Sequence, residues 1–67
     1  MAKKRLEPLY KFRKEKNLTQ REIAIVLGFS LSTYEKLERG YIKASRNFIE
    51  IFKSKYPHID IDYIFFS

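Results

Sequence analysis

Four polar side chains between the two glycines of the chain have types and a spacing suited to reading hydrogen-bonding groups. Gly28 and Gly40 enclose a short segment in which residues at relative positions 0, 3, 4 and 7 share one stripe of a helix: Ser32, Glu35, Lys36 and Arg39. Such a stripe can contact the edges of base pairs, because a helix fits the B-DNA major groove, which is about 12 Å wide. An ordinary solvated amphipathic helix would show the same periodicity.

Other clusters that could do chemistry are weaker. His58, Asp60 and Asp62 superficially resemble a metal site, but one histidine beside two carboxylates that can cap a turn is more typical of a surface loop. The absence of cysteine excludes disulfides and thiolate zinc sites. Scattered carboxylates such as Glu22 and Glu50 are interpreted as cap and surface groups. We therefore expect no enzymatic activity, metal, cofactor or small-molecule ligand.

The elements that must position the polar stripe are predicted to be helices. Apolar residues at helical spacing, with Pro8 in the first turn, predict a first helix over about residues 7–16, which Asn17 can end. Thr19 and Glu22 form a capping box that begins a second helix, and Gly28 suits the positive φ of its end. These two helices would precede the stripe directly.

The stripe itself lies on a third predicted helix. Ser30 or Ser32 can cap its start, and the helix runs to about residue 39, where Gly40 closes it. Ser45 can cap a fourth helix, which ends before Pro57. This helix has a wide apolar face, made of Phe48, Ile49, Ile51, Phe52 and Tyr56. Asp60 or Asp62 can cap a short last helix that contains Tyr63, Ile64 and Phe65.

Composition agrees with a single small all-α domain over residues 1–67. The chain has 67 residues, of which 45% are hydrophobic and 33% charged, so it is too apolar to be disordered. The longest apolar run, residues 23–27, is too short to span a membrane. We expect a cytoplasmic protein without a membrane partner.

Charge favours a nucleic-acid partner. The formal net charge is +6 and the isoelectric point is near 9.7, as expected of a protein that neutralises phosphates. Residues 1–21 hold eight basic and two acidic side chains, whereas residues 57–67 hold two aspartates and no Lys or Arg. The two ends should therefore face different partners, although charge alone also fits simple solubility.

The sequence resembles the Cro/CI-type helix-turn-helix regulators, also called the XRE family. The resemblance covers about residues 5–65 and depends on residues at the family's spacing: Leu18-Thr19-Gln20, Ala24, Gly28, Ser30 and Leu37-Glu38-Arg39-Gly40. It implies a compact five-helix, lambda-repressor-like domain that binds double-stranded DNA through a helix-turn-helix at about residues 19–39. The shortness of the chain resembles Cro-like proteins of phages and mobile elements.

The resemblance also implies site residues. The base-reading positions correspond to Leu31, Ser32, Glu35 and Lys36. By their chemistry, leucine can contact a thymine methyl, glutamate can accept from cytosine and lysine can donate to guanine. The phosphate-binding positions, which include main-chain N–H groups of residues 41–43, correspond to Gln20, Arg21, Arg39, Tyr41, Lys43 and Arg46.

Three further positions are interpreted through the resemblance. Arg13 and Glu38 match a buried or half-buried ion pair of the family, and we interpret them as structural. Tyr34 departs from the family, which usually has a β-branched aliphatic residue there; its ring either joins the core, which we favour, or leans out toward the DNA. Ala44 stands where many members have proline.

Aromatic residues near the end of the chain predict a dimer. These residues are Tyr56, Tyr63, Phe65 and Phe66. They supply more apolar area than a small monomer easily covers, so we expect a symmetric homodimer through about residues 56–67. Simple closure of the core is the alternative. Lys3-Lys4-Arg5 is either a solvated tail or an arm that binds phosphate.

The function that these observations favour is a transcriptional repressor that binds a pseudo-palindromic operator. The alternative is a protein-interaction module of the same fold, such as an antitoxin or an anti-repressor, with a protein partner in place of DNA.

Overall fold

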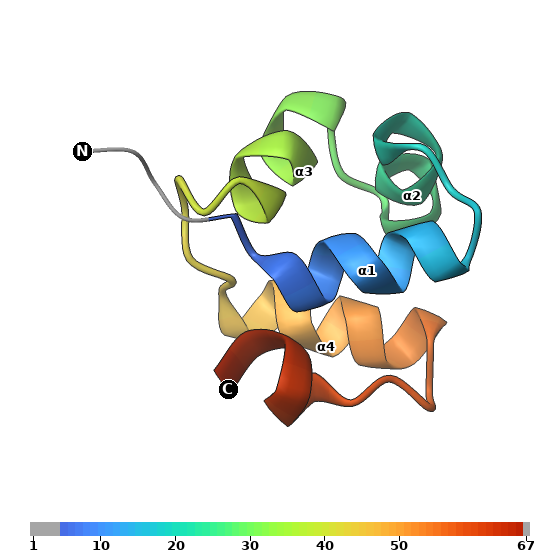
Figure 1. Cartoon of the computed structure of the whole chain (residues 1–67), viewed down its shortest axis with the longest axis vertical. Helices are drawn as coiled ribbons and strands as arrows, with labels where there is room; N and C mark the ends of the chain where they lie inside the picture. Colours follow the sequence, from blue (N-terminus) through green and yellow to red (C-terminus); the bar gives the residue numbers. More distant parts are fainter. Residues whose placement is uncertain (1–4, 67) are drawn as a thin grey trace.

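The computed structural model describes the backbone of residues 5–66 and the side chains of residues 5–65. Four α-helices and a terminal π-helical turn follow one another along the chain (Figure 1). Their bounds are α1 Glu7–Glu15, α2 Gln20–Leu27, α3 Leu31–Glu38, α4 Arg46–Lys55 and η1 Asp62–Phe66. No strand occurs within the described residues. The expected all-α, five-helix fold is confirmed.

The ends of the helices are set by local hydrogen bonds. Thr19 and Glu22 form the complete capping box of α2, and Ser45 caps α4. Ser30, and not Ser32, caps α3, because the Ser30 hydroxyl accepts from the Thr33 N–H over 3.1 Å. Asp60 caps the last turn by accepting from the Tyr63 N–H over 3.0 Å.

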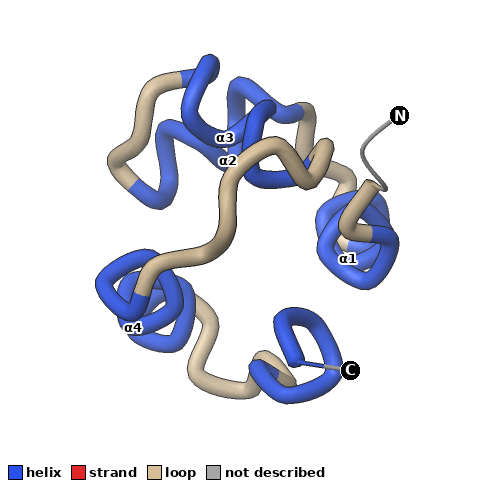
Figure 2. The backbone as a smooth tube through the Cα atoms, turned by 90° about the vertical axis from the view of Figure 1, so that its left-hand side faces the viewer, coloured by secondary structure: helices blue, strands red, loops and turns tan. Residues whose placement is uncertain are grey.

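The helices surround one core. α1 packs against α3 and η1, while α2 packs against α3 and α4; Figure 2 shows these elements around a common centre. The buried apolar side chains come from every helix: Leu9, Ile23, Ala24, Leu27, Tyr34, Leu37, Phe48, Phe52, Ile59 and Ile64. α3 is thereby held with one edge in the core. Among the described helices, none is long and apolar enough to cross a bilayer.

Candidate nucleic-acid interface

The turn between α2 and α3 holds the two helices in a fixed relation. α2 ends at Gly28 with φ 80°, in the left-handed region that favours glycine. The Phe29 N–H donates to the Ala24 carbonyl over 2.9 Å, and the Phe29 ring stacks on Phe48 of α4 at 4.4 Å between centroids. Ala24 is only 1% exposed, so a larger side chain there would displace its neighbours. The hydrogen bond of the turn and its packing on α4 thus hold α2 and α3 together as a helix-turn-helix.

α3 is buried along one edge and open along the other. Tyr34 and Leu37 lie in the core. The four side chains expected to read bases all reach the surface of the described chain: Ser32 and Lys36 are exposed, and Leu31 and Glu35 are partly exposed. Arg39, directly after the helix, is exposed as well. The stripe is therefore free to meet an external surface.

The loop after α3 carries cations, and two of the three main-chain N–H groups expected to bind phosphate have no partner among the described residues. The Gly40 N–H donates to the Leu37 carbonyl and the Tyr41 N–H to the Lys36 carbonyl, over 3.1 and 2.9 Å, which closes the helix end. The Tyr41 N–H is thus engaged and is not available to a phosphate, although its side chain is exposed. Within residues 5–66, the N–H groups of Ile42 and Lys43 donate no hydrogen bond. The expected main-chain contact with phosphate narrows to these two groups.

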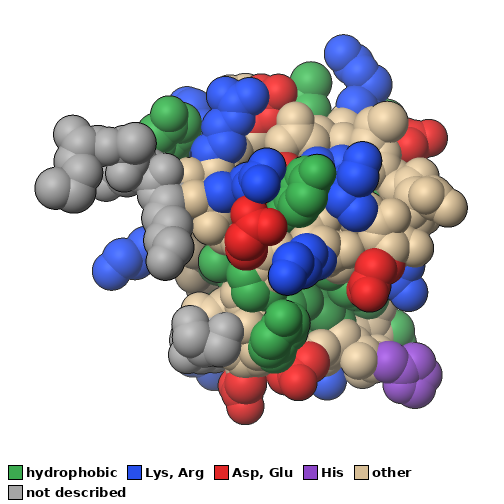
Figure 3. Space-filling view, viewed as in Figure 1, with side chains coloured by type: hydrophobic (Ala, Val, Ile, Leu, Met, Phe, Trp, Pro, Cys, Tyr) green, Lys and Arg blue, Asp and Glu red, His purple; other side chains and the backbone are tan. Residues whose placement is uncertain are grey.

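The other predicted phosphate contacts lie at the surface around the same helices. Arg21 is exposed in the first turn of α2, and Lys43 is exposed in the loop. Arg46 begins α4, where it forms an exposed ion pair with Glu50 at 3.5 Å. Figure 3 shows Lys and Arg side chains spread across one face of the molecule, with Asp and Glu side chains among them and at its lower edge. Exposed cations thus lie on α2, in the loop after α3 and at the start of α4.

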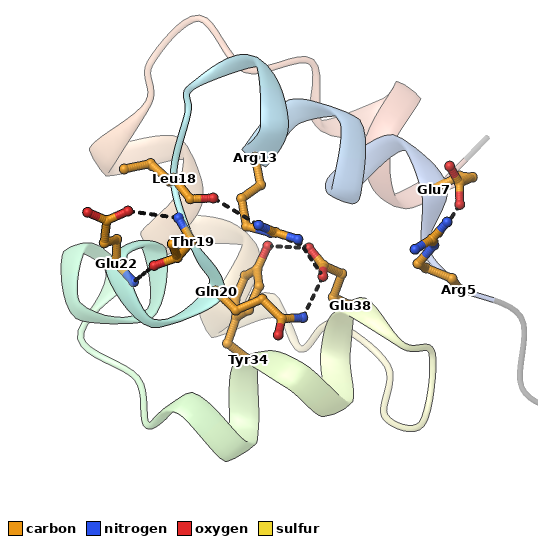
Figure 4. A network of polar contacts seen from close by, with 9 residues as sticks. All are labelled: Arg5, Glu7, Arg13, Leu18, Thr19, Gln20, Glu22, Tyr34 and Glu38. Carbon is orange, nitrogen blue, oxygen red and sulfur yellow. Dashed lines mark hydrogen bonds and ion pairs between the residues drawn. The ribbon is translucent and has the colours of Figure 1, made fainter.

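Glu38 is the centre of a buried polar network (Figure 4). Arg13 and Glu38 form the expected ion pair, with Nε donating to Oε1 over 2.8 Å and Nη2 to Oε2 over 3.2 Å. Arg13 Nη1 also donates to the Leu18 carbonyl over 2.8 Å. The pair joins α1 to the end of α3, and both residues are buried, at 7% and 2% exposure.

Two donors that the sequence analysis did not foresee complete this network. The Tyr34 hydroxyl donates to Glu38 Oε1 over 3.1 Å, and Gln20 Nε2 donates to Glu38 Oε2 over 2.6 Å. Tyr34 is therefore in the core, the interpretation favoured above, and its hydroxyl has a partner. The spacing of four residues between Tyr34 and Glu38 is the signal that could have revealed this bond. No comparable local signal exists for Gln20, which lies 18 residues away.

The network defines the charge state of its members. Burial alone raises the pKa of Glu38, but hydrogen bonds from Arg13 and Gln20 outweigh it and hold that pKa below its ordinary value. The hydrogen bond to Glu38 raises the pKa of Arg13. Burial and the neighbouring carboxylate raise the pKa of Tyr34 well above its ordinary value, so its phenol stays protonated and donates. Glu38 is thus a carboxylate in the folded protein at neutral pH.

The aromatic residues near the end of the chain divide between core and surface. Phe65 is partly buried and packs on Phe52 with ring centroids 5.6 Å apart, and Tyr56 packs edge-on against Phe12 at 5.1 Å. Tyr63 is 53% exposed. Two of the four predicted interface residues therefore already serve the core. The side chain of Phe66 and the positions of Lys3 and Lys4 lie outside the described residues.

Arg5, the described residue of the predicted basic arm, is held on the protein. It pairs with Glu7 at 2.7 Å and lies over the Tyr10 ring at 4.2 Å from the centroid. It remains exposed. A phosphate would therefore have to compete with Glu7 for this guanidinium.

Comparison with known proteins agrees with this geometry. A family model described as helix-turn-helix matches residues 9–63, which includes α2, the turn and α3. A search of curated proteins and a search of solved structures each found no significant match. The family match spans most of the chain and coincides with an all-helical fold that presents α3 at the surface. The chain therefore belongs to the XRE family of helix-turn-helix DNA-binding regulators.

Proposed function

We propose that the protein is a sequence-specific transcriptional repressor that inserts α3 into the major groove of its operator. The observation that carries this proposal is the two-sided character of α3, whose Tyr34 and Leu37 edge is buried while Ser32 and Lys36 are exposed. A helix anchored in this way can present side chains to base edges without losing its packing. Repression would follow from occupation of a promoter.

In this proposal, one set of residues reads the bases and another set binds the phosphates of the DNA backbone. Lys36, exposed on α3, would donate to guanine, and Glu35 would accept from cytosine. The remaining contacts would go to phosphates and orient the domain without reading sequence: Gln20, Arg21, Arg39, Tyr41, Lys43 and Arg46. The free N–H groups of residues 42 and 43 would contribute to the same set.

The experiment begins with selection of bound sequences from a random duplex pool, followed by measurement of affinity by fluorescence anisotropy. Lys36→Ala should reduce the preference at one base pair by about 1–3 kcal/mol, whereas Lys43→Ala should weaken all duplexes alike. Lys53→Ala, an exposed substitution on α4 away from α3, is the matched control. Equal losses on every sequence from the first two variants would contradict the assigned roles.

A second candidate is a protein-interaction module such as an antitoxin or anti-repressor. It is favoured by exposed apolar side chains on α2, namely Ile25 at 70% and Val26 at 40%. The salt dependence of duplex binding distinguishes the two candidate functions. A repressor that contacts about six phosphates should lose orders of magnitude in affinity for random duplex between about 50 and 200 mM salt. Absent or salt-insensitive binding would favour the interaction module.

We also propose a homodimer through residues 56–67. Two observations support the dimer. Tyr63 is exposed, and it lies beside Asp60 and Asp62, which make this segment acidic while the remainder of the chain is basic. A two-fold dimer would space its α3 helices about 34 Å apart and require a pseudo-palindromic site. Tyr63→Ser should give a monomer in analytical ultracentrifugation. Phe65 is not substituted, because it supports the core and its loss could unfold the protein as well as dissociate the dimer. An unchanged mass for Tyr63→Ser would show that the Tyr63 side chain is not part of the interface.

A further inference from the structure

Gln20 is the only predicted phosphate contact whose side chain is held by a buried group. Its Nε2 donates to Glu38 Oε2 over 2.6 Å, while the residue itself remains partly exposed. A side-chain amide carries two N–H donors on one nitrogen. One of them is engaged by Glu38, which restricts the orientation of the amide and leaves the second donor without a partner within residues 5–66.

Glu38 can orient Gln20 because its own position is fully determined. A carboxylate has about four acceptor sites, and four donors occupy them here. Oε1 accepts from Arg13 Nε and the Tyr34 hydroxyl, and Oε2 accepts from Arg13 Nη2 and Gln20 Nε2. Figure 4 shows the three donor side chains converging on Glu38 from α1, α2 and α3.

The charges in this network also suit an anion at Gln20. Arg13 neutralises the Glu38 carboxylate through two hydrogen bonds, which reduces the repulsion that Glu38 would exert on a phosphate. Gln20 is the first residue of α2, where the helix dipole favours negative charge. The Tyr34 hydroxyl adds no charge, and it comes from the same helix that carries the exposed stripe.

We propose that Tyr34 and Glu38 act together as positioning residues for DNA binding: the Tyr34 hydroxyl holds Glu38 in the orientation that aims the Gln20 amide at a DNA phosphate. The inference rests on the proposed function, since it needs a duplex at α3. It assigns Tyr34 a role beyond filling the core. The link also fixes α2 to the end of α3, so the phosphate contact and the base-reading helix are placed relative to each other.

The test is a double-mutant cycle on the selected duplex, with Tyr34→Phe and Gln20→Ala. Tyr34→Phe keeps the buried ring and removes only the donor. It should weaken binding about tenfold on specific and random duplexes alike, because a phosphate contact carries no sequence information. If Tyr34 acts through Gln20, the double variant should bind no more weakly than Gln20→Ala alone. Tyr10→Phe is the matched control, because the Tyr10 hydroxyl makes no hydrogen bond within residues 5–66, and it should bind as the unmodified protein does.

Two readouts separate positioning from stability. Circular dichroism must show the variants folded at the assay temperature, and the NMR signals of the Gln20 side-chain amide in the free protein should shift in Tyr34→Phe but not in Tyr10→Phe. Should Tyr34→Phe prove unfolded at the assay temperature, the same cycle is run at a lower temperature in sucrose, an excluded osmolyte that favours the folded state.

Each outcome is decisive. Unchanged affinity of Tyr34→Phe, or losses that add to those of Gln20→Ala, would overturn the positioning role while leaving the proposed function intact. Failure of the unmodified protein to bind any duplex would overturn both.

Discussion

Removal of the Arg13 guanidinium should destabilise this protein more than any surface substitution. Arg13→Met keeps the aliphatic stem but deletes three hydrogen bonds of 2.8, 3.2 and 2.8 Å. Glu38, at 2% exposure, is then left as a buried charge with only the donors of Gln20 and Tyr34. Breaking a buried pair from one side typically costs about 3–5 kcal/mol. Small domains have total stabilities of about 0.05–0.15 kcal/mol per residue, or about 3–10 kcal/mol for 67 residues, so the substitution should remove from about a third to all of the free energy of unfolding.

The same reasoning predicts a rescue. Replacing the charged pair and its buried neighbour together, as Arg13→Met with Tyr34→Phe and Glu38→Leu, leaves neither an unpaired buried charge nor an unpaired buried phenol. The Gln20 amide is partly exposed and can turn to water. Since buried ion pairs contribute little net stability compared with apolar replacements of similar volume, the triple variant should lie within about 2 kcal/mol of the unmodified protein.

Urea unfolding at pH 7, followed by far-ultraviolet circular dichroism because the chain has no tryptophan, measures these differences. Arg46→Met, which breaks only the exposed pair with Glu50, is the control and should leave the unfolding midpoint nearly unchanged. A cost below about 1 kcal/mol for Arg13→Met, or a triple variant as unstable as the single one, would refute the account of a desolvated pair.

Three further predictions concern stability. Gly28→Ala should cost about 1 kcal/mol in urea unfolding, because φ is +80° although no atom lies within 4 Å of an added Cβ; a cost near zero would contradict a backbone origin. Ser30→Ala should cost about 1 kcal/mol through loss of the α3 cap, whereas Ser32→Ala should alter DNA binding and leave stability unchanged. Since the pKa of Glu38 in the folded state lies below its ordinary value of 4.5, its stabilisation should be complete above pH 4.5 and should decline as the pH falls toward the folded pKa. Glu38→Gln should flatten this decline in acid titrations followed by circular dichroism, and an equal flattening by the exposed Glu50→Gln would refute the assignment.

Much of the fold could be predicted because its signals are local. The capping box joins Thr19 and Glu22, which are three residues apart, and the positive φ values occur at glycines that end helices, Gly28 and Gly40. The motif spacing that indicated the XRE family is likewise read directly from the sequence. The periodicity of α3 likewise separated its buried edge from its exposed stripe. The choice between Ser30 and Ser32 as the cap stayed open, because both satisfy the same local rule.

The tertiary structure decided which side chains of different helices come into contact. Whether Tyr34 turns inward depends on space in the core and on a carboxylate that Arg13 of α1 holds in place. Gln20 meets Glu38 only because α2 and α3 cross at the turn, and Phe65 joins the core only because η1 folds back on α1. Local preferences act over one or two helical turns, whereas these contacts join residues that only the packing of the whole chain brings together.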